Sequence, residues 1–63
     1  MSNEILEFEC TIQHQTADAW KVYIVDEDAE YWFPKSQVEI EFNPGDTDTI
    51  FIPEWLALDI GIL

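Results

Sequence analysis

Apolar and polar residues alternate with a period of two along much of this chain, and that alternation limits what the chain can fold into. From residue 6 to residue 12 the even positions are apolar and the odd positions are polar, and residues 38–42 repeat the pattern with glutamates at the polar positions. Successive side chains of a β-strand point to opposite faces. Residues 6–14 and 38–42 are therefore predicted to be strands with one buried and one exposed face.

Three further segments have the composition of strands. Residues 20–25 and 30–33 are β-branched or aromatic on both alternations, which predicts strands that are covered on both faces, and residues 48–52 form a fifth short strand. Turns are expected at 15–18, 26–29, 34–37 and 43–46. Pro34 ends a strand or places it at an edge because it has no N–H for a ladder, and Pro44-Gly45 favours a tight turn.

A short helix is predicted at the end of the chain. Pro53 suits the first helical position, the run 54–60 follows, and Gly61 suits the stop. A helix of this length is not stable by itself, so it must pack on the strands.

The predicted fold class is mainly β: a small antiparallel four- to five-stranded meander or SH3-like barrel with a short C-terminal helix, forming a single domain over residues 1–63. So small a chain buries little surface, and its only cysteine, Cys10, cannot form an intrachain disulfide. The core is therefore expected to depend on the nine aromatic residues, with Cys10 as a buried apolar side chain. The helix, the curling of the sheet, or a second copy in a homodimer would cover the second face of the two-sided strands.

Fourteen carboxylates against two lysines give a formal net charge of −12, in a chain that is 48% hydrophobic. The hydrophobic content favours a folded protein with an acidic exterior over a disordered one. The charge disfavours direct binding to nucleic acid or to anionic membranes, so a basic partner is expected. No signal peptide or apolar span is evident, and with one unpaired thiol the expected location is the host cell cytoplasm.

Ten carboxylates are candidate partner-binding residues. Pairs two residues apart on a strand lie about 6.7 Å from each other on one face, a spacing similar to that of neighbouring phosphates. The alternative is that they only keep the protein soluble and protect sheet edges, but a net charge of roughly 2–8 suffices for that in a small domain. The candidates are two strand pairs and two turns: Glu7, Glu9, Glu39 and Glu41, then Asp26, Glu27, Asp28 and Glu30, then Asp46 and Asp48.

Other chemistries are not expected. Residues 26–30 could hold calcium, but they lack the glycine and distal glutamate of an EF-hand loop. No cofactor or metal site is predicted, no catalytic group is apparent around Cys10 and His14, and the domain has little room for a substrate cleft, so the protein is not expected to be an enzyme. Trp32-Phe33-Pro34 resembles part of a groove for proline-rich peptides, but these aromatics are expected to be core residues.

Two sequence blocks carry a resemblance. Trp32-Phe33-Pro34-Lys35-Ser36-Gln37 and Ile52-Pro53-Glu54-Trp55-Leu56-Ala57 resemble a pattern in short, mostly uncharacterised proteins of phages and mobile elements. The resemblance implies a β-rich scaffold in which the first block shapes a strand-to-turn corner and the second begins the closing helix. The tail, residues 58–63, is more apolar than this pattern.

A looser analogy, in size and charge, is to phage-encoded inhibitors that mimic DNA, including anti-CRISPR proteins. It implies an acidic inhibitor that occupies the basic nucleic-acid-binding groove of a host defence protein, in its most specific form an anti-CRISPR protein acting on a CRISPR effector subunit. The alternatives are a phage-encoded protein–protein adaptor that binds through Leu56, Ile60, Ile62 and Leu63, and an accessory protein of phage replication.

Overall fold

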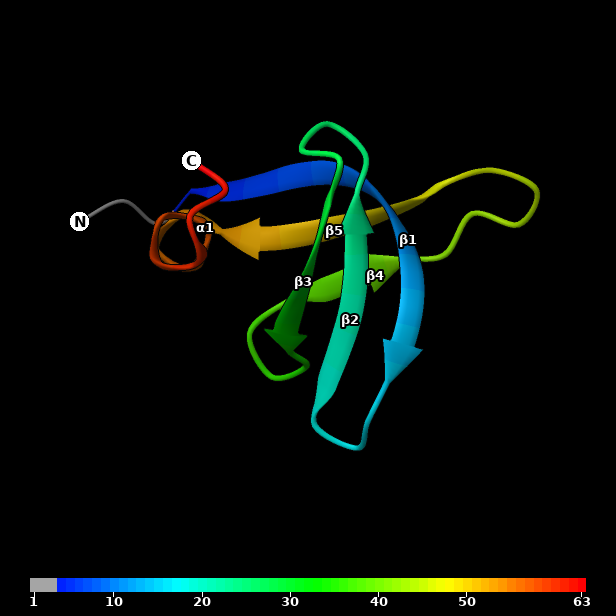
Figure 1. Ribbon diagram of the computed structural model, residues 1–63, viewed down its shortest axis with the longest axis horizontal. Coiled ribbons are helices and arrows are strands. Elements are labelled where there is room, and N and C mark those ends of the chain that lie inside the picture. The colour runs from blue at the N-terminus through cyan, green and yellow to red at the C-terminus, as the bar shows by residue number, and fades with distance from the viewer. Residues whose placement is uncertain (1–3) are drawn as a thin grey trace.

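The computed structural model describes residues 4–63, which form one five-stranded antiparallel sheet and a short C-terminal helix (Figure 1). The predicted mainly-β fold class is confirmed. The elements are β1 (Ile5–Gln15), β2 (Ala19–Ile24), β3 (Ala29–Pro34), β4 (Glu39–Glu41), β5 (Asp48–Pro53) and α1 (Glu54–Ile60). Residues 1–3, which belong to the predicted domain and to the segment expected to lack a signal peptide, lie outside the described residues.

The strand order is β3-β2-β1-β5-β4, so β3 and β4, although consecutive in the chain, lie at opposite edges. The long strand β1 is shared between two halves of the sheet. Its residues 5–10 pair with β5 and its residues 10–15 pair with β2, with a register shift between Ile12 and His14. Figure 1 shows the result: β1 bends, so that β2 and β3 cross in front of β4 and β5.

Cys10 lies where the two halves of the sheet meet. It pairs with Ile24 of β2 and with Asp48 of β5, and its side chain is fully buried. Around it, alternate positions of the strands supply the core, together with residues from the β3–β4 connection and from the C-terminal segment. The buried cluster comprises Cys10, Val22, Ile24, Phe33, Val38, Ile50, Ile52, Leu56, Ala57 and Ile62.

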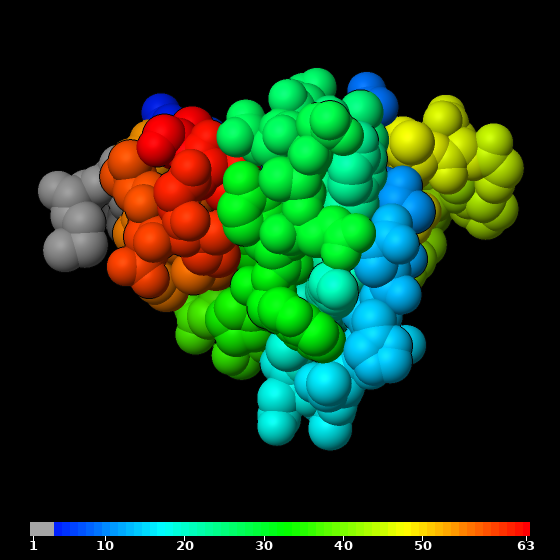
Figure 2. All heavy atoms as spheres, viewed as in Figure 1, coloured from blue at the N-terminus to red at the C-terminus, as the bar shows by residue number. Residues whose placement is uncertain are grey.

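The helix begins and ends at the residues that the sequence indicated, with one difference at its start. Pro53 is the last residue of β5 and the N-cap, so the first helical residue is Glu54. Gly61 adopts φ 98°, and the N–H groups of Gly61 and Ile62 both donate to the Ala57 carbonyl, each at 3.0 Å. The left-handed glycine turns the chain back so that Ile62 enters the core. α1 and the chain end adjoin the β2–β3 hairpin (Figure 2).

A tight corner follows β3. Pro34 ends β3, the Gln37 N–H donates to the Pro34 carbonyl at 3.0 Å, and the Lys35 N–H donates to the Asp18 carbonyl at 2.8 Å. Lys35 Nζ donates to Gln15 Oε1 at 2.8 Å and lies 4.3 Å from the Trp20 ring centroid, so the Lys35 side chain ties the corner to β1 and β2.

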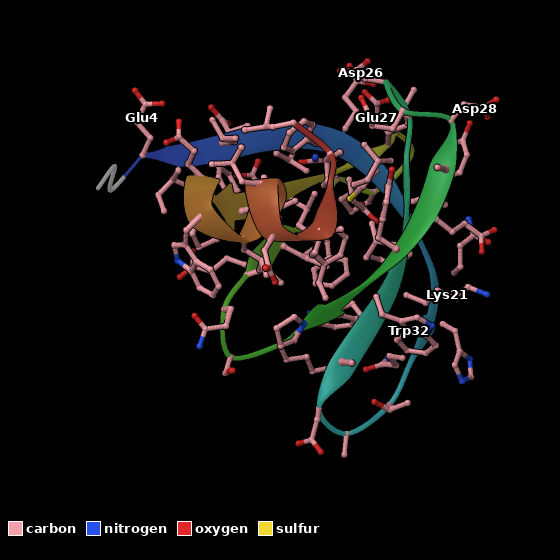
Figure 3. All side chains as sticks on the ribbon, turned by 60° about the vertical axis from the view of Figure 1, so that its left-hand side comes forward. Glu4, Lys21, Asp26, Glu27, Asp28 and Trp32 are labelled. Carbon is pink, nitrogen blue, oxygen red and sulfur yellow. The ribbon has the colours of Figure 1, made fainter. Side chains whose placement is uncertain are left out.

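The aromatic residues of β3 divide between the two faces. Phe33 is fully buried, whereas Trp32 is 48% exposed, so the expectation that Trp32 belongs to the core is wrong. The register explains the difference: Phe33 pairs with Trp20 on the inner face, and Trp32 pairs with Lys21 on the outer face. Figure 3 shows Lys21 and Trp32 close together on that outer face, away from the acidic β2–β3 turn.

Candidate partner-binding face

Four of the predicted carboxylates meet on one outer face of the sheet. Glu7 of β1 and Glu39 of β4 both pair with Phe51 of the intervening strand β5. Directly paired residues share a face, so Glu7, Phe51 and Glu39 form one row across three strands.

A second, parallel row lies one strand repeat further on. Glu9 and Glu41 both pair with Thr49. Because positions i and i+2 of a strand share a face, this row lies on the same face as the first. We refer to its two glutamates and the two of the first row as the glutamate quartet: Glu7, Glu9, Glu39 and Glu41, all exposed.

Strand geometry sets the dimensions of the quartet. Glutamates on the same strand are about 6.7 Å apart, and those on β1 and β4, two strand spacings apart, are separated by about 9.6 Å. The three strands carry no lysine on this face. Lys21 is in an ion pair with Glu30 at 3.2 Å, and the Lys35 ammonium is held by Gln15 and Trp20. The quartet therefore presents a negative field that no cation of the described chain neutralises locally.

The predicted acidic turn between β2 and β3 lies beside one corner of the quartet. The Val25 N–H, at the start of the turn, donates to the Glu9 carbonyl at 3.1 Å. Asp26 and Glu27 are exposed at the tip of the hairpin, as Figure 3 shows. The turn thus places further negative charge close to β1.

Two members of that predicted group have structural partners. Asp28 adopts φ 50°, a left-handed conformation that aspartate tolerates, and its Oδ1 accepts a hydrogen bond of 2.6 Å from the Tyr23 hydroxyl. This hydrogen bond raises the pKa of Tyr23. Glu30 is in the ion pair with Lys21 described above, on the outer face of the β2–β3 half of the sheet. Asp28 and Glu30 are therefore separate from the quartet.

The second predicted acidic turn mainly organises its own loop. Asp46 Oδ1 accepts from the Thr47 N–H at 2.7 Å, and Asp48 Oδ1 accepts from the Asn43 N–H at 2.9 Å. Asp48 is only half exposed and pairs with the buried Cys10, so it lies on the opposite face of β5 from Thr49. The structure does not bring Asp48 together with the quartet.

A pocket at the other end of the same face was not predicted from the sequence. It has a volume of about 280 Å³ and is lined by Ile5, Ser36, Gln37, Val38, Glu39, Phe51 and Pro53. Ile5 pairs with Pro53, one strand repeat from the row that contains Phe51. The only sign of this pocket in the sequence was that both faces of β5 carry apolar residues. That pattern is equally explained by a strand that is covered on both faces.

The apolar C-terminal patch that was considered for an adaptor is divided by the fold. Leu56 and Ile62 belong to the buried core, Ile60 is half-buried, and Leu63 is exposed. The apolar residues that α1 leaves open are instead Trp55 and Leu58. Leu56 and Ile62 are therefore not available to a partner.

Among residues 4–63, no group of three or more histidine, cysteine, aspartate or glutamate side chains is arranged to hold a metal ion, and none of the buried residues is polar or charged. Burial and the nearby Asp48 carboxylate raise the pKa of the Cys10 thiol from 9.0 to about 11, which keeps it protonated and unreactive at neutral pH. His14 is exposed and its ring meets that of Trp32 edge-on, with centroids 6.2 Å apart.

The described part of the chain contains no helix with the length and apolar character needed to cross a bilayer. Comparison with known protein families, with curated proteins and with solved structures finds no match to this chain.

Proposed function

We propose that this protein is a non-enzymatic inhibitor that occupies the basic nucleic-acid-binding groove of a host protein in the cytoplasm. The observation that carries the proposal is the glutamate quartet. Its members lie on β1 and β4 of one sheet, on either side of β5, so their backbones are held at fixed spacings. Partners that bind nucleic acid present arginines and lysines at the spacing of phosphates, and a fixed array of carboxylates is complementary to such a surface.

The excess of charge supports the same function. Like charges held on one face oppose folding, and a net charge of −12 is more than solubility requires. The β2–β3 turn, with Asp26 and Glu27 at its tip, extends the acidic surface beyond the quartet. A surface that costs stability and exceeds the needs of solubility is typical of a binding surface.

The narrowest form of the proposal is an anti-CRISPR protein of phage or mobile-element origin that acts on a DNA-recognition subunit. It rests on the analogy in size and charge and on the two sequence blocks. A panel of purified DNA-binding effector complexes, each assayed for duplex binding with and without this protein, tests this form. If the protein inhibits none of these complexes, the anti-CRISPR assignment is wrong and the broader proposal stays in place.

The broader proposal is tested by retention of bacterial proteins on the immobilised chain, followed by elution with duplex DNA or with salt. The variants are the fourfold Glu7→Gln, Glu9→Gln, Glu39→Gln, Glu41→Gln chain and, as a control outside the acidic surface, an Asp18→Asn, Asp59→Asn chain. We expect DNA to elute the bound partner, the fourfold variant to lose it, and the double variant to keep it. A partner that withstands DNA and binds the fourfold variant equally well would contradict the proposal.

Charge reversal separates this function from a protein–protein adaptor. Glu39→Lys with Glu41→Lys is expected to abolish binding of the partner, because it places cations against a basic surface. Leu58→Asp, at an exposed position of the C-terminal helix, is expected to leave binding intact. The opposite result would favour an adaptor that binds through the helix.

A further inference from the structure

The pocket and the glutamate quartet belong to one continuous surface, the outer face of β1, β5 and β4. Ile5 and Pro53 form an apolar row at one end of this face. The two rows of the quartet follow it, first the row with Phe51 and then the row with Thr49. Successive rows are about 6.7 Å apart. An apolar hollow is therefore followed, at strand spacing, by two negatively charged rows.

The hollow is suited to a side chain and not to a large ligand. Its volume of about 280 Å³ lies just below the roughly 300–1,000 Å³ typical of sites for drug-sized molecules. Ile5, Phe51 and Pro53 give it apolar walls, and Ile5 is 58% exposed although it is aliphatic. Filling the hollow would remove apolar surface from water, which favours an aliphatic or aromatic occupant.

The rim determines what else the occupant carries. Glu39 lines the pocket itself, and Glu7 lies on the other side of Phe51 in the same row. Neither lysine of the chain is placed to neutralise them, since the ammonium groups of Lys21 and Lys35 contact Glu30 and Gln15. An apolar side chain that enters here is next to two carboxylates, and a basic residue beside it would be favoured.

We propose that this face binds an extended basic segment of a partner protein, with an apolar residue in the pocket and arginine or lysine at the second and fourth positions after it. In an extended segment these side chains share one side and repeat about every 6.7 Å, which matches the three rows. The inference rests on the proposed function and adds to it an apolar anchor and a direction. A groove that satisfied the quartet by charge alone would not need the anchor.

Short peptides with blocked ends test the proposal by amide NMR titration of the full chain at low ionic strength. The probe has a leucine, arginines two and four residues later, and serine elsewhere. One control replaces the leucine by serine, and the other places the leucine between the arginines, with the same composition. We expect the first probe to shift the amides of Ile5, Glu39 and Phe51, and both controls to bind about tenfold more weakly, which is the lower end for burying a leucine.

Two variants test the pocket by changing the protein instead of the peptide. Ser36→Phe adds bulk at an exposed position of the pocket wall, and Ile5→Ser removes part of the apolar wall without changing the charge. Each is expected to lower affinity for the leucine probe to that of the serine control, while the amide spectrum shows that the fold is kept. Equal binding of all three peptides, or no effect of either variant, would overturn the anchor and leave the quartet as a purely electrostatic surface.

A third measurement separates the anchor from the proposed function. Glu7→Gln with Glu39→Gln is expected to weaken the leucine probe and to reduce the salt dependence of its binding. If the double variant leaves affinity unchanged while Ser36→Phe still lowers it, the pocket binds apolar residues without help from charge, and the proposal of a basic segment is wrong. Pocket amides that shift with protein concentration alone, without peptide, would identify a second copy as the occupant and overturn the proposal.

Discussion

Removing two charges from the glutamate quartet is expected to stabilise the protein. The change is Glu39→Gln with Glu41→Gln, both exposed on the edge strand β4, which brings the formal net charge from −12 to −10. It leaves the paired backbone of β4 and β5 intact and removes five of the six repulsions within the quartet, all but the one between Glu7 and Glu9.

The magnitude follows from the sheet geometry. The five repulsions act over about 6.7 Å along β4, about 9.6 Å across to β1 and about 11.7 Å on the diagonals. With the dielectric constant of water and a Debye length of about 30 Å, near 0.01 M salt, they sum to about 1.6 kcal/mol. With a Debye length of about 8 Å, at 0.15 M, the sum falls to about 0.7 kcal/mol, and at 1 M it is about 0.1 kcal/mol.

The assay is urea unfolding of both proteins at these three salt concentrations. We expect the variant to gain stability at low salt and the gain to disappear at 1 M. The control, Asp18→Asn with Asp59→Asn, removes the same charge from two exposed positions outside the quartet, one in the loop before β2 and one in α1. Its gain is expected to be smaller.

The reasoning would be refuted by a gain that is the same at all three salt concentrations, because only screened charge repulsion predicts that it disappears. A loss of stability would show that the two glutamates make favourable contacts that outweigh their repulsion. The prediction also opposes stability to function, since the same variant is expected to weaken binding to a basic partner.

Three further predictions concern the core, the helix end and titration. Phe33→Ala, which empties a fully buried site, is expected to cost about 3–5 kcal/mol of unfolding free energy and to leave the domain largely unfolded. Trp32→Ala, on the outer face, is expected to cost less than about 1 kcal/mol. Urea unfolding followed by circular dichroism compares the two variants. Gly61→Ala forces an L-residue to φ 98° and is expected to cost about 1 kcal/mol by thermal unfolding, and an unchanged midpoint would mean that the turn into the core relaxes freely. Folding raises the pKa of Cys10 from 9.0 to about 11, so the folded state favours the protonated thiol. The stability that this thiol contributes is complete below pH 9 and is lost as the pH rises through about 11, and Cys10→Ala is expected to reduce that loss in alkaline unfolding experiments. The wild-type thiol is expected to react with a maleimide only after urea is added.

The sequence predicted most of the secondary structure, because its determinants are local. The alternation over residues 6–12 fixed which side chains of β1 face inward, and Pro34 and Gly61 end their elements where they were expected to. The orientation of β3 was less accessible. Residues 31–33 are all aromatic, so the local sign that Trp32 faces water is Glu30, two residues earlier on the same face, and the register with β2 decides it.

The candidate face shows the same limit more strongly. The pairs Glu7/Glu9 and Glu39/Glu41 were recognised from their spacing, but nothing local indicates that β5 lies between β1 and β4 and aligns the two pairs in rows. The pocket depends on the same nonlocal pairing. Asp48 was predicted to be surface charge, yet the register places it opposite Cys10, where it accepts a hydrogen bond within the loop.

The position of β5 between β1 and β4 has a consequence for when the proposed binding face is assembled during synthesis. The two halves of the quartet lie in β1 and β4, while the strand that joins them, β5 (Asp48–Pro53), follows both in the chain. A ribosome holds the most recently made residues in its exit tunnel, so β5 emerges only after both pairs of glutamates have emerged. The proposed binding surface is therefore absent from every nascent chain whose β5 has not emerged, and termination between Glu41 and Asp48 yields a product that carries all four glutamates without their arrangement.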